Sequence, residues 1–106
     1  MILAQAAPAD TNNAVLYTVT SRIILRKLFI ANNTAGAIAA RVFMDDNGTT
    51  ATTATAILYD KSVPANDTVE VDFDEATLST PTGTITIRSA TGDALCFTLF
   101  GEEALS

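Results

Sequence analysis

Apolar and polar residues alternate along most of this chain, a pattern typical of half-buried β-strands rather than of helices. The alternation is cleanest over 68–73, where valine and phenylalanine are interleaved with threonine, glutamate and aspartate. It recurs over 38–45, 84–88 and 95–99. Turn residues separate these runs at intervals of about 8 to 12 positions, the spacing of a sandwich or barrel. The pattern therefore predicts an all-β chain.

Two details of the pattern predict how individual strands behave. The nearly continuous apolar stretch over 23–30 is interrupted by Arg26 and Lys27. Two adjacent charges at that place predict a β-bulge or a sheet edge. The first run, over 14–19, is expected to place three residues on one face: Val15, Tyr17 and Val19.

Turn-forming residues predict where the strands end. The segments 45–48 and 64–67 are rich in aspartate, asparagine, glycine and proline, and Gly48 can adopt a positive φ. The run over 49–55 has too many threonines for a core strand, and we expect a mobile connection there. A turn at 91–93 is expected to join the last two strands into a hairpin.

These runs add up to seven or eight strands and no convincing helix. A chain of 106 residues fits a single domain with one hydrophobic core. Residues 1–13 have no periodicity and predict an extended N-terminal arm, either disordered or docked on a neighbouring subunit. Residues 14–106 then form the domain. We predict an antiparallel two-sheet sandwich of the jelly-roll type.

The charge balance excludes several classes of partner. Twelve Asp and Glu outnumber six Lys and Arg, which gives a formal net charge of -6. Nucleic-acid binding depends on clustered basic side chains, and an acidic surface repels anionic lipid. The start of the chain lacks the basic region of a signal peptide, and no segment approaches the roughly 18 apolar residues of a membrane span. We expect a protein made in the cytoplasm, with no nucleic-acid or membrane partner.

The residue inventory argues against an enzyme. There is no histidine to activate a nucleophile, and the only cysteine, Cys96, lies in an apolar run and is expected to be a buried, inert thiol. Asp72 and Asp74 on one strand face are interpreted as solubilising groups. The acidic loops 45–47 and 72–75 lack the spacing of a calcium loop, so turn formation is favoured over metal binding. We predict no catalytic residue, cofactor or metal.

Four segments share their order with a known group of proteins: 14–19, 27–34, the strand that ends at Met44, and 94–103 with its closing Gly-Glu-Glu. Over about 13–103 this order resembles small β-sandwich proteins encoded among the virion genes of tailed bacteriophages. The resemblance implies a capsid decoration, or cement, protein on the outside of the phage head. An alternative is a tail or head-fibre module that recognises a host surface glycan or protein.

The implied partners are the major capsid protein and further copies of the chain. Open sheet edges also favour self-association, and we expect a homotrimer on the capsid surface. Ile2 and Leu3 are apolar residues of the arm and are candidates for docking on the capsid. Other candidates lie on strand faces opposite the predicted core, where an aromatic side chain can equally be covered by a loop. These subunit-interface candidates are Leu16, Phe43, Tyr59 and Phe100.

Overall fold

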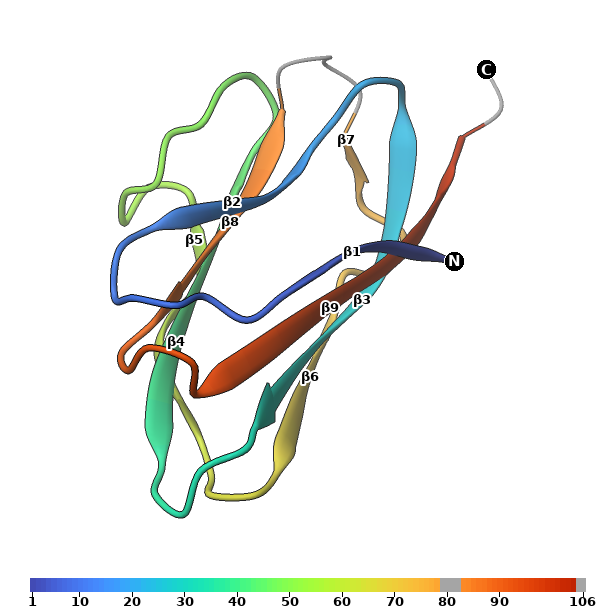
Figure 1. Ribbon diagram of the computed structural model, residues 1–106. Coiled ribbons are helices and arrows are strands. Elements are labelled where there is room, and N and C mark those ends of the chain that lie inside the picture. Colours follow the sequence, from blue (N-terminus) through green and yellow to red (C-terminus); the bar gives the residue numbers. More distant parts are fainter. Residues whose placement is uncertain (79–82, 105–106) are drawn as a thin grey trace.

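The computed structural model describes residues 1–78 and 83–104, which form nine strands and no helix (Figure 1). The prediction of an all-β fold is confirmed, with nine strands rather than seven or eight. In chain order the strands are β1 (Ile2–Ala6), β2 (Ala14–Thr18), β3 (Ile23–Asn32), β4 (Ile38–Asp45), β5 (Ala56–Val63), β6 (Thr68–Asp72), β7 (Thr77–Leu78), β8 (Thr84–Ser89) and β9 (Leu95–Glu103).

The strands form two antiparallel sheets that pack face to face. Sheet A has the order β1-β9-β3-β6, with the short β7 also paired to β3, and sheet B has the order β2-β8-β4-β5. Within the sheets the partners are nested, because β1 pairs with β9, β2 with β8, β3 with β6 and β4 with β5. The chain is thus folded in half about the β4–β5 connection and rolled up, which confirms the jelly-roll sandwich.

The expected hairpin between the last two strands is wrong. Strand β8 lies in sheet B between β2 and β4, whereas β9 lies in sheet A between β1 and β3. Both edges of each strand are already paired, so the turn at 90–94 carries the chain from one sheet to the other. The start of the chain crosses this turn: the Asp93 N–H donates to the Pro8 carbonyl (2.8 Å), and a Cβ at Gly92 would collide with the Ala9 carbonyl.

The bulge predicted at Arg26 and Lys27 is confirmed. The pairing of β3 with β9 shifts by one residue between Leu25 and Lys27. Because strand side chains alternate with a period of two, Leu25 and Leu28 would lie on opposite faces of a regular strand. The extra residue puts both in the core, where they are fully buried, and leaves the two charged side chains outside.

A second bulge, in β2, shows that the prediction of Val15, Tyr17 and Val19 on one face is wrong. Pairing of β2 with β8 shifts between Val15 and Tyr17. Leu16 and Tyr17 pack against the core, whereas Val15 is 51% exposed. A single extra residue moves a strand's side chains to the other face, which is why the alternation at Val15 misleads.

The predicted arm lies along the domain. Residues 2–6 form strand β1, which pairs with β9 at one edge of sheet A. Leu3 packs against the core, and Pro8 is buried. Docking of this segment on a neighbouring subunit stays a prediction.

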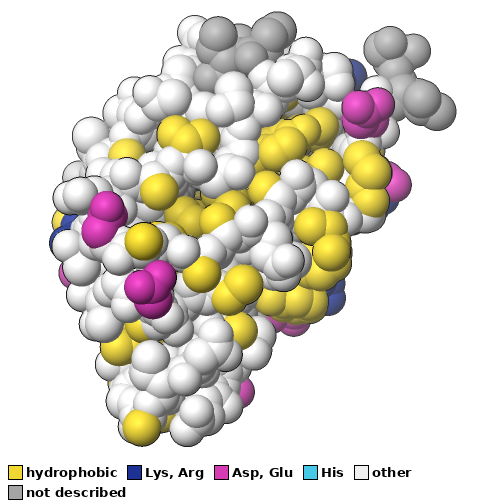
Figure 2. Space-filling view, in the orientation of Figure 1, with side chains coloured by type: hydrophobic (Ala, Val, Ile, Leu, Met, Phe, Trp, Pro, Cys, Tyr) yellow, Lys and Arg dark blue, Asp and Glu magenta, His cyan; other side chains and the backbone are white. Residues whose placement is uncertain are grey.

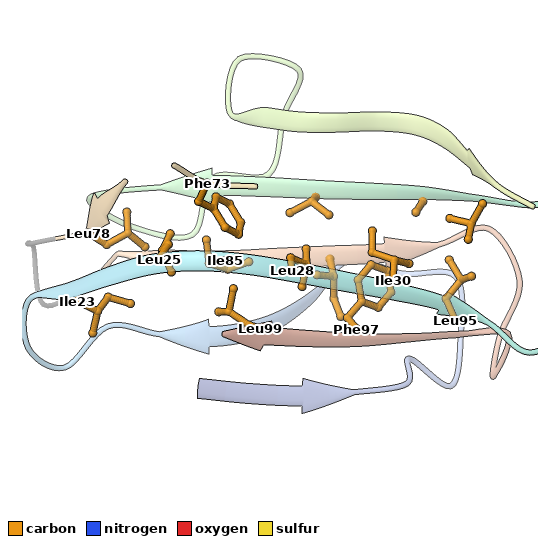
Figure 3. Packing of buried hydrophobic residues seen from close by; sticks show 14 of the residues in the cluster. Ile23, Leu25, Leu28, Ile30, Phe73, Leu78, Ile85, Leu95, Phe97 and Leu99 are labelled. Atoms are coloured by element: carbon orange, nitrogen blue, oxygen red, sulfur yellow. The ribbon is translucent and has the colours of Figure 1, made fainter. Parts of the chain in front are cut away.

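The core fills the space between the two sheets (Figure 3). Strands with clean alternation in the sequence supply much of it, because every second side chain of such a strand faces inward. The largest fully buried side chains are Phe97, Ile23, Leu25, Leu28, Ile30, Leu78, Ile85, Ile87, Leu95, Leu99, Val19 and Val42.

The turn after β4 is held by a carboxylate. Asp45 accepts hydrogen bonds from the backbone N–H groups of Asn47 and Thr50, both at 2.9 Å. Gly48 has the positive φ expected from the sequence, at 127°. The Thr84 hydroxyl donates to the Gly48 carbonyl (2.8 Å), which fixes the turn to β8. These donated N–H bonds, that of Asn47 first, hold the pKa of the Asp45 carboxyl below its ordinary value.

The lowered pKa of Asp45 predicts that acid reduces the stability of the fold. A carboxyl whose folded pKa is depressed adds stability above its unfolded pKa of about 3.9, and this is lost as the pH falls through the folded pKa. Asp45→Asn removes the titrating group, so we expect the free energy of unfolding to fall less steeply with acidification below about pH 4. Urea titrations across a pH series measure the slope, and an unchanged slope would contradict the assignment.

Candidate functional site

The residues predicted to contact partners separate into three pairs. Ile2 and Phe100 are direct partners in the pairing of β1 with β9, and lie on the outer face of sheet A. Phe43 and Tyr59 meet on the outer side of sheet B. The remaining two pack against the core: Leu3 and Leu16.

The outer face of sheet A has an aromatic pair at its centre. The ring centroids of Phe29 and Phe100 lie 5.2 Å apart, with the rings inclined at 66° in an edge-to-face contact. Both side chains are half-buried, and the adjoining Ile2 is 57% exposed. Sequence reasoning missed Phe29. Its position between the buried Leu28 and Ile30 is the signal that could have placed it on the outer face.

One border of this aromatic face is charged. Glu70 on β6 lies opposite Phe29 and forms an ion pair with Lys27, Nζ to Oε1 at 2.7 Å, which raises the pKa of Lys27. At the bulge, Arg26 forms ion pairs with Glu102 and Glu75. These side chains are exposed to water, so the ion pairs add little stability.

The opposite border, along β1, carries no charged side chain. There the Gln5 side-chain amide donates to the Thr98 hydroxyl at 2.8 Å. Gln5 and Thr98 are direct partners in the pairing of β1 with β9, one row from Ile2 and Phe100. The aromatic face is therefore flanked by ion pairs on one side and by neutral side chains on the other.

The aromatic residues of sheet B are covered or engaged within the chain. Phe43 is only 2% exposed and packs edge-on against Tyr59, with ring centroids 6.5 Å apart. The Arg41 guanidinium lies 4.0 Å from the Tyr59 ring centroid and donates two hydrogen bonds to Asp60, at 2.7 and 3.1 Å. Those bonds hold the pKa of Asp60 below its ordinary value. Phe43 thus offers no surface to a partner, in line with the alternative that such an aromatic is covered.

The side chains weighed in the sequence for chemical roles, Cys96 and the acidic pair Asp72 and Asp74, lie outside the aromatic pair. Cys96 is only half-buried, because the even-numbered residues of β9 face outward, so the expectation of a buried thiol is wrong. The Asp72 carboxylate accepts a hydrogen bond from the Asp74 backbone N–H at 2.8 Å, as a turn residue does.

The described residues show no recess and no metal cluster. Residues 1–78 and 83–104 contain no pocket and no group of three or more His, Cys, Asp or Glu side chains placed to hold a metal ion. Nor does this part of the chain hold a helix long and apolar enough to cross a membrane. The candidate site is the outer face of sheet A around Ile2, Phe29 and Phe100, which we call the aromatic face.

Comparison with known proteins gives structural neighbours only. No family model and no curated protein sequence matches the chain. A chain in the crystal structure of the T13 viral particle of infectious bursal disease virus (IBDV) matches with 11% identity and a TM-score of 0.52, over 92% of this chain and 27% of that chain. A chain in the structure of infectious bursal disease virus Gx strain matches with 11% identity and a TM-score of 0.50, over 95% and 30%.

These matches show the fold that the chain shares with them. The chain spans less than a third of the length of either neighbour. The same sandwich architecture is therefore present, as one part of a longer chain, in two viral particles.

Proposed function

We propose that this chain is a non-enzymatic structural protein of a virus particle. The observation that carries the proposal is the nested strand order of the jelly roll, an architecture shared over 92% and 95% of the chain with chains of viral particles. Viral capsid domains are among the recurrent uses of this architecture. A fold alone admits many functions, so the proposal also rests on the surface that the chain presents.

The finer proposal is a decoration, or cement, protein on the outside of a tailed-bacteriophage head, with the major capsid protein as its partner. The order of the segments 14–19, 27–34 and 94–103 supports it by resemblance. The aromatic face supplies a means of binding, because half-buried aromatic side chains at the centre of a surface are the usual anchors of protein interfaces. Its action would be burial of apolar surface and hydrogen bonding, with no bond made or broken.

The experiment is a binding titration with assembled capsids that lack this protein. Purified protein is added, capsids are sedimented, and bound copies are counted by quantitative mass spectrometry. We expect saturation at a fixed number of copies per capsid. Phe100→Asp is expected to weaken binding at least about tenfold, equivalent to about 1.4 kcal/mol, because it puts a charge at the centre of the aromatic face.

A matched control separates this effect from general loss of apolar surface. Ile57→Asp places the same charge at a 37%-exposed position on β5, in the other sheet, and is expected to bind as the wild type does. Absence of saturable binding, or equal binding by the Phe100 variant, would contradict the proposal. Binding to host cells in place of capsids would favour the tail or head-fibre module.

A further inference from the structure

The turn after β4 contains an asparagine that is directly followed by a glycine. Asn47 precedes Gly48, whereas the residue after every other asparagine of the sequence has a side chain. Asn47 is exposed and lies outside the strands, at the end of the sandwich beside the start of β8 (Figure 1). On the face shown in Figure 2, this end presents mainly uncharged polar side chains and backbone. Asn47 is therefore in contact with water and next to a residue without a Cβ.

The backbone N–H group that follows Asn47 is available for reaction. The N–H groups of Asn47 and Thr50 donate to Asp45, but no hydrogen bond between the described residues engages the Gly48 N–H. Gly48 also has a φ of 127°, which residues with a Cβ rarely adopt. The conformation of the turn thus requires the glycine that leaves the side chain of Asn47 open to attack from its own backbone.

Other exposed asparagines of the chain differ from Asn47 in this respect. The N–H group that follows Asn33 donates to the side-chain carbonyl of Asn32 at 2.9 Å. The N–H group that follows Asn66 donates to the Pro64 carbonyl at 3.3 Å. In both cases the next residue also has a side chain. These two asparagines are therefore internal controls for the reactivity of Asn47.

We propose that Asn47 is a site of spontaneous deamidation and isomerisation, since asparagine is among the thermally labile residues of proteins. The Gly48 amide nitrogen loses its proton to hydroxide and attacks Cγ of Asn47, and the side-chain nitrogen leaves as ammonia. Water then opens the resulting succinimide ring at either of its carbonyl groups. Opening at the former side-chain carbonyl gives aspartate. Opening at the main-chain carbonyl gives isoaspartate, whose main chain is longer by one carbon atom.

The isoaspartate product would release the turn from β8. The hydroxyl of Thr84, a residue 1% exposed, donates to the Gly48 carbonyl at 2.8 Å. A Cβ at Gly83 would lie 3.0 Å from the Asp46 carbonyl oxygen, so the turn and the start of β8 are in close contact. A longer main chain displaces the Gly48 carbonyl and leaves a buried hydroxyl without its acceptor, which is destabilising. This inference goes beyond the proposed function and does not rest on it.

Peptide mapping by mass spectrometry tests the site. The full chain is kept folded in warm, mildly alkaline buffer, and each asparagine is followed over time. We expect conversion at Asn47 to be at least about tenfold faster than at Asn33 or Asn66, the effect of a barrier lower by about 1.4 kcal/mol. The rate should rise in proportion to the hydroxide concentration, because the attacking nitrogen must first lose its proton. Conversion no faster than at the other two asparagines would overturn the proposal.

Two variants at the same position separate the chemistry from its structural effect. Asn47→Gln keeps the amide but would have to close a larger ring, so residue 47 is expected to stay intact. Anion exchange separates reacted from unreacted wild type, and enzymatic methylation of isoaspartate measures the isomerised share. Reacted chains are expected to unfold at a lower urea concentration than both unreacted chains and Asn47→Asp, which keeps a normal main chain. Equal midpoints for all three would overturn the release of the turn from β8.

Discussion

Replacing Phe97 by alanine is expected to lower the free energy of unfolding by about 3–5 kcal/mol. The side chain is fully buried on β9, opposite Ile30 of β3, and points between the two sheets (Figure 3). Its removal leaves a cavity that neighbours on two rigid sheets fill only in part. Because a domain of this size has a total stability of about 5–15 kcal/mol, the variant loses a large share of it. Chemical denaturation followed by circular dichroism measures the difference.

Phe100→Ala is the matched control on the same strand. Phe100 lies on the outer face, half-buried against Phe29. Its loss removes one edge-to-face contact and part of the burial of one ring, about 1–2 kcal/mol together. A deficit equal to that of Phe97→Ala would mean that the outer face is as closely packed as the core, and would contradict the assignment of Phe100 to a contact surface.

Local alternation predicted the strands well because one face of each is buried. Val69, Val71 and Phe73 do turn toward the core, and Leu95 and Leu99 are fully buried. The bulge at Arg26 was also predictable, since two charges between buried leucines cannot be accommodated in a regular strand of period two.

Strand partners and faces were predicted less well, because they depend on distant residues. The alternation of β8 and β9 suits a hairpin as well as two separate sheets, and only the nested pairing with β2 and β1 decides between them. The exposure of Val15 depends on a bulge that no charge or glycine marks in the sequence. The pairing of residues 2–6 as β1 needs β9, about 90 residues away in the chain.

The candidate site could also not be assembled from the sequence, because it depends on which strands pair. Ile2 and Phe100 were chosen from the sequence for different reasons, one as part of an arm and one as an outward aromatic. The structure makes them neighbours, since the first and last strands of the jelly roll are paired. Phe43 was placed correctly opposite the main core, but its burial against Tyr59 requires the path of β5, which alternation does not give.

Asn32 is a buried polar residue whose side chain makes four hydrogen bonds. It is 2% exposed at the end of β3. Its side-chain amide donates to the carbonyls of Val63 and Gly36, each at 2.9 Å, and its carbonyl accepts from the backbone N–H and the hydroxyl of Thr34, at 2.9 and 2.7 Å. One side chain thus ties the end of β3 to the turn after it and to the end of β5.

Asn32→Ala is expected to lower the free energy of unfolding by about 2–4 kcal/mol, because each buried polar group left without a partner costs about 1–3 kcal/mol. The exposed neighbour gives the matched control: Asn33→Ala is expected to change stability by about 0.5 kcal/mol or less. Urea denaturation at neutral pH compares the two. Equal values for both variants would mean that the four hydrogen bonds of Asn32 add nothing beyond those of a surface residue.

Asn32→Asp distinguishes lost hydrogen bonds from lost packing, because the volume of the side chain is kept. An ionised carboxyl cannot donate to the carbonyls of Val63 and Gly36, and it would be buried beside their oxygens. Burial raises the folded pKa of the introduced carboxyl above its unfolded value of about 3.9. The deficit relative to the wild type is therefore full above the folded pKa and shrinks as the pH falls, when the protonated carboxyl can donate one bond again. A deficit that stays constant down to about pH 4 would show that the two donated bonds do not hold this corner of the sandwich.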